Sequence, residues 1–282
     1  MGRQGSRAAR SVIWILLVTF SCIFLVPFAW LLLTAFKPEA QMFAPPTTLE
    51  YWIPRPATME NFIGAFSQKQ FRFPLFLANS LLLCELCVIG TVLSSSLVAY
   101  GFSRVEWPGR NILFFIMLST MMLPGQVTMI PVFMIYRKLH WINTFRPLVV
   151  PSFLGSAFFV FLLRQFFMTV PEDLLDAARI DGCSEFGIWR KVMLPLSKPA
   201  LATVALFTFM GTWNDFMGPL IYLLDEERYT LSLGLAMFRG QYNSEYGQLM
   251  AVSAIMTVPI VILFFFTQKT FIQGIKLTGI KG

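Results

Sequence analysis

Six long apolar runs constrain the fold of this chain more than any other feature of its sequence. About 20 consecutive apolar residues are needed to cross the hydrocarbon core of a bilayer as an α-helix. Inside that core every backbone N–H and C=O must be paired within the segment, which favours helices for isolated runs. The runs cover residues 12–36, 75–100, 112–135, 148–167, 200–224 and 249–271. The sequence therefore predicts an all-α membrane protein with six transmembrane helices.

The composition agrees with a membrane protein, and two further features argue against a cleaved signal peptide and against nucleic-acid binding. Only 13% of the residues are charged, whereas soluble domains are typically about 25% charged. The first apolar run is too long for a signal peptide, and no small-residue cleavage pattern follows it. The net charge of +7 is spread over loops rather than gathered on a basic helix with aromatics, so we expect no nucleic-acid binding.

The distribution of Lys and Arg predicts the orientation in the membrane. With six spans both termini lie on one side, and that side carries thirteen of these residues against nine on the other. We therefore expect a cytoplasmic tail at residues 1–11, a transmembrane domain at 12–271 and a second cytoplasmic tail at 272–282. The bacterial or archaeal plasma membrane is the expected location, and the loop at 171–199 then faces the cytoplasm.

This loop carries the most specific motif of the chain. It contains a short helix with its own stop, since Glu172 and Asp173 suit a first helical turn and Gly182 suits the left-handed position after the last turn. Pro171 fits the start of such a helix. The motif reads Asp176-Ala177-Ala178-Arg179-Ile180-Asp181-Gly182, followed twelve residues after the glycine by Leu194-Pro195. The alanines leave little bulk, so the groove of another protein could approach the backbone here.

The motif resembles the EAA loop of ABC-importer permeases. Asp176 stands where that family more often has Glu, and Val192 where it more often has Ile. The resemblance to maltose-type carbohydrate permease subunits extends from about residue 12 to the C-terminus. Further matching stretches are Tyr100-Gly101-Phe102-Ser103-Arg104, Leu123-Pro124-Gly125-Gln126-Val127, Leu163-Arg164-Gln165-Phe166-Phe167, Pro195-Leu196-Ser197-Lys198-Pro199-Ala200-Leu201, Trp213-Asn214-Asp215 and Lys281-Gly282.

The resemblance implies a type I ABC-importer permease fold with a cytoplasmic coupling helix. It implies a second permease subunit of the same fold, two ATPase subunits and an extracytoplasmic substrate-binding protein as partners, besides membrane lipid. It also implies that the final outward loop approaches the binding protein's cleft. The expected ATPase-coupling residues are Asp176, Ala177, Ala178, Arg179, Asp181, Gly182, Leu194 and Pro195.

The chain is not expected to be an enzyme. It lacks the glycine-rich phosphate-binding loop of nucleotide-hydrolysing proteins, so we expect ATP to be used by the partner subunits and no cofactor to be bound here. The expected cargo is a sugar or oligosaccharide, with glycerol phosphate or a polyol as the alternative within the same class.

Ionisable residues within predicted spans are candidates for the transport route, because they are costly in a membrane. Trp213, Asn214 and Asp215 combine an aromatic face with two hydrogen-bonding groups, which suits a sugar. The alternative for Asp215 is a structural cap or a bond between helices. For Glu85 a structural role is favoured, without excluding a functional one.

Two functions outside the importer class are alternatives, a membrane thiol enzyme and a secondary transporter. A membrane thiol enzyme would need reactive Cys84 or Cys87, although two small apolar packing residues explain that pair more simply. A secondary transporter would need no ATPase and often contains paired repeats with interrupted helices. Neither explains the loop, and no metal site is expected because His140 is the chain's one histidine.

Overall fold

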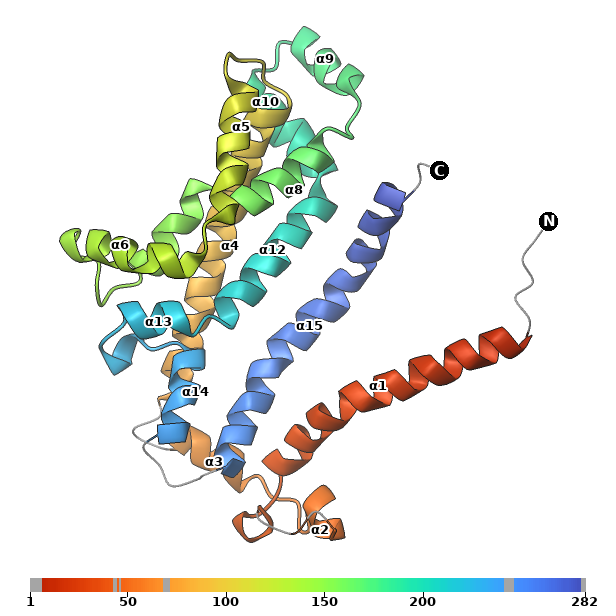
Figure 1. Cartoon of the computed structure of the whole chain (residues 1–282), viewed down its shortest axis with the longest axis vertical. Helices are drawn as coiled ribbons and strands as arrows, with labels where there is room; N and C mark the ends of the chain where they lie inside the picture. The colour runs from red at the N-terminus through yellow and green to blue at the C-terminus, as the bar shows by residue number, and fades with distance from the viewer. Residues whose placement is uncertain (1–6, 43–44, 46, 68–71, 241–245, 280–282) are drawn as a thin grey trace. The chain divides into compact units, whose positions relative to one another are not determined.

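A computed structural model of the chain describes residues 7–42, 45, 47–67, 72–240 and 246–279. Every regular element among these residues is a helix, as the apolar runs predict (Figure 1). The chain divides into two compact units, of which unit 1 comprises residues 1–73 and 235–259 and unit 2 comprises residues 74–234 and 260–282.

Unit 1 contains α1 (Arg7–Ala35), η1 (Glu39–Gln41), α2 (Leu49–Trp52) and α3 (Glu60–Ser67). The connection after α1 is held by polar side chains that bond to the backbone. Lys37 is 1% exposed; its Nζ donates to Thr34 Oγ1 at 3.2 Å and to the Tyr51 carbonyl at 2.5 Å. Asn61 donates to the carbonyls of Ala35 and Lys37. These bonds fold the proline-rich stretch after α1 back onto the end of the helix.

The helices of unit 2 are numerous and several are short. In chain order they are α4 (Phe73–Ser103), α5 (Arg110–Ser119), η2 (Thr120–Met122), α6 (Gly125–Lys138), α7 (Arg146–Val149), η3 (Val150–Leu154), α8 (Ala157–Phe167), α9 (Glu172–Ile180), α10 (Glu185–Ile188), η4 (Trp189–Met193), α11 (Leu194–Leu196), α12 (Lys198–Trp213), α13 (Met217–Tyr222) and η5 (Glu226–Arg228). Two further helices, α14 (Leu231–Gly240) and α15 (Tyr246–Gly279), contribute residues to both units.

Four described helical segments are long and apolar enough to cross a bilayer, and the number rises to six if each of two bent pairs is one span. The four segments are Ala9–Ala35, Phe73–Ser103, Arg146–Phe167 and Tyr246–Thr267. They overlap the predicted runs at 12–36, 75–100, 148–167 and 249–271. The total of six spans stays a prediction.

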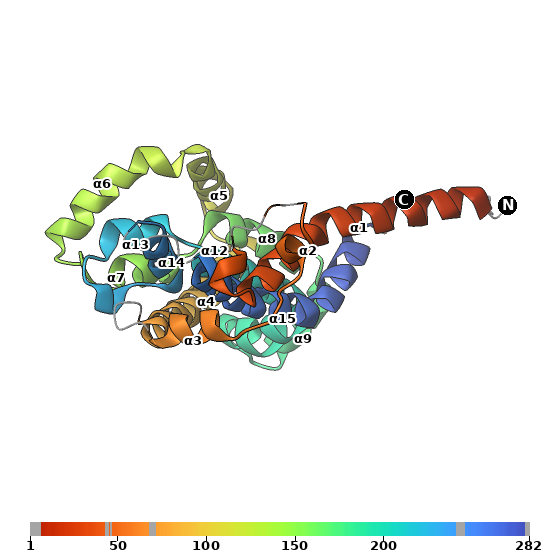
Figure 2. The ribbon, with the colours of Figure 1, turned by 90° about the horizontal axis from the view of Figure 1, so that it is seen from below.

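The predicted run at 112–135 is divided by a sharp bend. Its two parts, Arg110–Met122 and Gly125–Lys138, meet at 101° (Figure 2). Pro124 precedes α6 and has no N–H to continue the ladder. It also forces an extended backbone on Leu123, whose ψ is 116°. Pro131, by contrast, lies inside α6. Pro124 therefore ends a helix, whereas Pro131 does not.

The predicted run at 200–224 is also not one continuous helix. α12 ends at Trp213, and α13 begins only at Met217. A second bend of 83° lies before α12, between Glu185–Leu196 and Lys198–Trp213. Pro199 stands in the first turn of α12, where its missing N–H costs nothing. Most of residues 217–224, which follow the break, are also apolar. Hydrophobicity alone therefore predicts one longer span.

The core of unit 2 positions the loop at 171–199. Leu163 and Phe167 of α8 are fully buried with Leu175 of α9, Ile188 of α10 and Met193 of η4. Burying an aliphatic or aromatic side chain of this size contributes about 1.5–3 kcal/mol. The loop is therefore packed onto the ends of α4, α8 and α12 as part of the core.

Candidate functional site

The predicted stop of the loop helix is confirmed by its backbone. Gly182 has φ +77°, and its N–H bonds to the Arg179 carbonyl at 3.0 Å while the Cys183 N–H bonds to the Ala178 carbonyl at 2.9 Å. This pair of bonds is the Schellman arrangement, which satisfies the last carbonyls of a helix. Pro171 lies one position earlier than predicted, as the residue that precedes α9.

The structure divides the two alanines that were expected to meet a partner. Ala178 packs against the buried core around Leu175, whereas Ala177 is exposed. The small size of Ala178 thus serves packing within this chain. Only Ala177 offers a low surface to an approaching protein.

An exposed face of α9 surrounds Ala177. We name it the docking face and define it by exposed residues one and two turns apart along the helix: Asp173, Leu174, Ala177, Ile180 and Asp181. Ile180 is 86% exposed. A short helix that buries Leu175 and leaves Ile180 open has apolar groups on two opposite sides, and an exposed apolar patch rimmed by acids is typical of a protein-binding surface.

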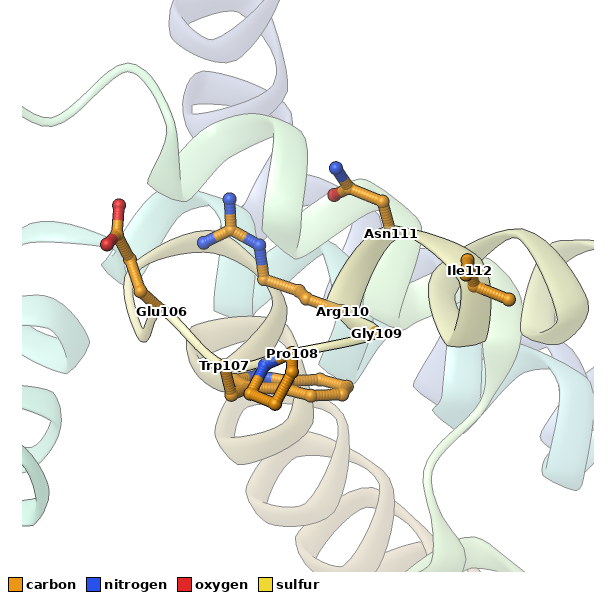
Figure 3. Close-up of a pocket in the computed structure, with 7 residues that line it drawn as sticks. All are labelled: Glu106, Trp107, Pro108, Gly109, Arg110, Asn111 and Ile112. Atoms are coloured by element: carbon orange, nitrogen blue, oxygen red, sulfur yellow. The ribbon is translucent and has the colours of Figure 1, made fainter.

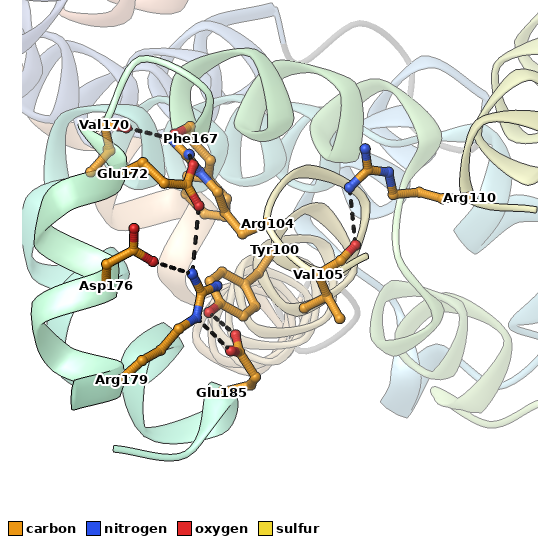
Figure 4. Close-up of polar contacts among 10 residues, drawn as sticks. All are labelled: Tyr100, Arg104, Val105, Arg110, Phe167, Val170, Glu172, Asp176, Arg179 and Glu185. Carbon is orange, nitrogen blue, oxygen red and sulfur yellow. Dashed lines mark hydrogen bonds and ion pairs between the residues drawn. The ribbon is translucent and has the colours of Figure 1, made fainter. Parts of the chain in front are cut away.

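Arg179 connects α9 to α10 through carboxylates. Its Nη1 lies 2.8 Å from Asp176 Oδ1 and 3.6 Å from Glu172 Oε1, and its Nε lies 2.9 Å from Glu185 Oε1 (Figure 4). The bonds from Glu185 and Asp176 raise the pKa of Arg179. The same arginine is the main cause that lowers the pKa of Glu185. Arg179 and Glu185 are therefore both charged at neutral pH.

Tyr100 of α4 and Arg104, which directly follows α4, extend this cluster into the transmembrane helices. The Tyr100 hydroxyl donates to Glu185 Oε2 at 2.5 Å. Arg104, whose side chain is only 7% exposed, pairs with Glu172 and donates through Nη2 to the carbonyls of Phe167 and Val170. The end of α4 is thereby tied to α8, α9 and α10 at once (Figure 4).

Sequence reasoning did not assign these roles to Tyr100, Arg104 and Glu185. The first two lie four residues apart at the end of a predicted span, so they share a helix face beside the loop. That spacing was the available signal, but the carboxylates they meet lie 68 and 85 residues away in the chain.

The remaining predicted coupling residues of the loop are Asp181, Leu194 and Pro195. Asp181 is exposed after the last turn of α9. Leu194 packs against the buried core, and Pro195 is exposed at the start of α11. The motif thus combines an inward-facing part, which fixes the loop, with an outward-facing part.

The residues expected on the transport route lie at the other end of α12. α12 has 16 residues, so its two ends lie about 24 Å apart along the helix axis. The Trp213 ring is 2% exposed and stacks on Phe209 with centroids 5.5 Å apart. Asn214 is exposed, and its Nδ2 donates to the Met210 carbonyl at 2.8 Å.

Asp215 has a structural role in the break between α12 and α13. Its Oδ1 accepts the Gly218 N–H at 3.0 Å, and its carbonyl accepts a bond from Ser232 Oγ at 2.6 Å. The geometry thus supplies the cap that was one of the two alternatives for this residue. The Trp213 ring, being buried, presents no free face beside it.

In α4, Glu85 lies on a different side of the helix from Cys84 and Cys87. Glu85 is exposed, while the two thiols are buried and point at the carbonyls of Phe209 and Leu148. A reactive thiol needs access and an activating neighbour, and this packing provides no access. In the part of the chain that the structure describes, no group of three or more His, Cys, Asp or Glu residues could hold a metal ion.

Comparison with known proteins identifies the class of this chain. Residues 90–277 match the family described as binding-protein-dependent transport system inner membrane component. The arabinooligosaccharides transport system permease protein AraQ of Halalkalibacterium halodurans is 36% identical over 272 residues, covering 95% of this chain and 96% of the relative. The chain belongs to this family of ABC-importer permeases.

Other similarities extend over nearly the whole permease. The trehalose/maltose transport system permease protein MalG of Thermococcus litoralis is 33% identical, with 96% of each chain covered. A crystal structure of a bacterial ABC transporter involved in alginate import has a TM-score of 0.84 at 23% identity, covering 95% of this permease and 98% of that chain. The expected all-α permease fold is thus confirmed, and the thiol-enzyme and secondary-transporter interpretations are wrong.

Proposed function

We propose that this permease is one of two membrane subunits of an ATP-driven importer for a sugar or an oligosaccharide. The support comes from relatives named for arabinooligosaccharides and for trehalose and maltose. Glycerol phosphate or a polyol is the alternative cargo within the class. Measuring uptake of labelled arabino- and malto-oligosaccharides beside glycerol phosphate, in vesicles containing the whole complex, distinguishes these cargoes.

The proposal includes the partners and the orientation. A second permease of the same fold, two ATPase subunits that use the ATP and an extracytoplasmic binding protein complete the complex. Both termini and the docking face lie in the cytoplasm, because the Lys and Arg excess falls on that side. Cysteine labelling at Ser232 tests this, since labelling from the cytoplasm alone would contradict the orientation.

The observation that carries the coupling role is the two-sided construction of α9. One side of this helix is fixed to the transmembrane core by Leu175 and the arginine cluster, while the docking face stays open. Closure of the ATPase pair on ATP would pull on the docking face. The buried side would pass that motion to α4, α8 and α12, which rock the spans between inward-open and outward-open states.

A bulky residue on the docking face provides the test. Ala177→Trp adds a large ring to the exposed side of α9 without entering the core, so the permease should insert normally. We expect weaker copurification of the ATPase, or ATP hydrolysis that no longer responds to binding protein and substrate. Ala9→Trp is the matched control, because Ala9 is also exposed and the proposed topology places it near the same side of the membrane.

The decisive measurement compares hydrolysis and uptake in the same reconstituted vesicles, with each subunit quantified. Parental coupling in Ala177→Trp at equal subunit content would show that the docking face does not contact the ATPase. An effect of the same size in Ala9→Trp would show that added bulk acts without regard to place.

A further inference from the structure

We infer that a shallow hollow at the start of α5 binds the phosphate of an anionic phospholipid headgroup. The hollow has a volume of about 670 Å³ and is lined by residues 106–112, which join α4 to α5 (Figure 3). It lies at the end of the long apolar helix α4, where headgroups meet the protein. Its position is separate from the docking face of α9.

The backbone around the hollow is well held. Trp107 donates Nε1 to the Gly101 carbonyl at 3.1 Å and packs on Phe102 with ring centroids 5.6 Å apart. Gly109 has φ +85°, a left-handed conformation that allows the sharp entry into α5. A Trp anchored at the end of a span is typical of the membrane–water interface.

Two arginines concentrate positive charge beside this hollow. Arg110 lines it (Figure 3) and donates Nη1 to the Val105 carbonyl at 3.1 Å (Figure 4). The Arg164 guanidinium lies 4.3 Å from the centre of the Phe114 ring. Since Phe114 is four residues after Arg110, it lies on the same face of α5. The two cations therefore stand next to each other at one end of this helix.

Neither cation makes an ion pair with the described part of the chain. Among the residues that the structure describes, Arg104 and Arg179 make ion pairs with carboxylates, whereas Arg110 and Arg164 make none. Arg164 uses Nε for the Phe102 carbonyl at 3.1 Å, which leaves its two amino groups for another acceptor. Two partly buried guanidinium groups side by side repel one another unless an anion lies between them.

The surroundings favour a lipid as the source of that anion. Ile112, at the edge of the hollow, and Phe115 beyond it are exposed apolar side chains that continue along α5 from the arginines. Acyl chains could cover these residues while the phosphate contacts the guanidinium groups. Glu106 is the one acid that lines the hollow, and its carboxylate stands apart from Arg110 (Figure 3), so we place the phosphate on the side of Arg110 and Asn111.

Native mass spectrometry of the purified complex tests the inference. The complex is incubated with phosphatidylglycerol or phosphatidylcholine, and the retained lipid is counted for the parent and for the double variant Arg110→Gln/Arg164→Gln. We expect retention of phosphatidylglycerol to fall about fivefold for each charge removed, which corresponds to about 1 kcal/mol per basic residue. Phosphatidylcholine should be retained weakly by both proteins.

Two further variants separate this effect from misfolding and from general charge. Arg110→Lys/Arg164→Lys keeps both charges and should retain phosphatidylglycerol. Arg137→Gln/Lys138→Gln removes two charges at the end of α6 and should bind phosphatidylglycerol like the parent. Equal loss in this control, or unchanged retention in the Arg110→Gln/Arg164→Gln variant, overturns the inference.

Inorganic phosphate distinguishes a headgroup from a free anion. Adding phosphate alone should displace phosphatidylglycerol only weakly, because the free ion lacks the acyl chains that cover Ile112 and Phe115. Full displacement by inorganic phosphate, or equal retention of phosphatidylcholine, would rule out a headgroup site. None of these outcomes depends on whether α9 contacts an ATPase.

Discussion

The α9–α10 segment lies in the connection from α8 to α12, and the turn from Asn214 to Gly218 lies at the break between α12 and α13. The two regions are held in different ways. The first is fixed by polar and charged side chains that connect it to α4 and α8, including the pair between Arg104 and Glu172. The second is fixed by hydrogen bonds, from the Gly218 N–H to Asp215 and from Ser232 to the Asp215 carbonyl. The first arrangement suits a part that transmits force as one body, while the second suits a local break that can adjust on its own.

Of the changes that test this contrast between the two regions, removal of Arg104 should have the largest effect. Its side chain is 7% exposed, whereas that of its partner Glu172 is 54% exposed. The main cost of Arg104→Ala is therefore the loss of the donor to the Phe167 and Val170 carbonyls, at about 1–3 kcal/mol for each buried acceptor left unpaired. We expect Arg104→Ala to release α9 from α4 and α8, so that ATPase copurification and uptake are both strongly reduced. Arg104→Lys should rescue little, because lysine lacks the planar fork that reaches Glu172 and two carbonyls together.

The control for this prediction is Arg190→Ala, which removes an exposed cation of the same loop. Copurified ATPase and uptake are measured per inserted permease in all three variants. If Arg104→Ala couples like the parent, α9 is held by its apolar side alone and the contrast between the two regions disappears.

Substitution of Gly182 should have the second-largest effect, because it changes only one end of α9. A Cβ at this position would meet no atom within 4 Å, so the cost of a substitution arises from the positive φ. Gly182→Val should cost about 1–2 kcal/mol and loosen the docking face, whereas Gly182→Asn should be tolerated. Hydrolysis stimulated by binding protein and substrate is the readout, and equal results for Val and Asn would contradict the role of the left-handed stop.

Much of the loop but little of its surroundings could be predicted from the sequence. The stop at Gly182 and the acidic first turn at Glu172 follow from local preferences that act within one helix. The partner of Arg104 could not be predicted, because Glu172 reaches it only after the intervening helices have folded. The spacing of Leu175 and Ala178 puts both on one face of the helix, but local sequence does not say which face packs against the rest of the chain.

The break after Trp213 was missed for a different reason. Residues 217–224 remain apolar, and hydrophobicity averaged over a window cannot detect a cap formed by one Asn and one Asp. The aromatic face that was expected to meet a sugar is buried on Phe209. A pattern of residue types that suits a ligand thus also suits packing, and burial separates the two.

The turn at Asn214 should show a smaller effect that separates two neighbours. Loss of a capping side chain typically costs about 0.5–2 kcal/mol, so Asp215→Ala should lower thermal stability, while Asp215→Asn keeps the acceptor oxygen and should not. Asn214 is exposed, and we expect Asn214→Ala to reduce uptake a few-fold at unchanged stability. If transport per assembled complex stays at the parental level in both Asn214→Ala and Asp215→Asn, these two residues do not line the transport route.

Acid should produce the smallest effect, and only in the α9–α10 segment. Arg179 lowers the pKa of Glu185, so the stabilisation from this pair is complete above the unfolded pKa of about 4.3 and is lost as the pH falls through the lower folded value. Coupling should therefore stay constant from about pH 8 to pH 5. Because both side chains are partly exposed, the contribution is small. ATPase copurification with purified complexes, followed from about pH 8 to below pH 4, tests the sign. Glu185→Gln should remove the dependence below pH 4, and a loss of coupling already at pH 6 would mean that another group controls it.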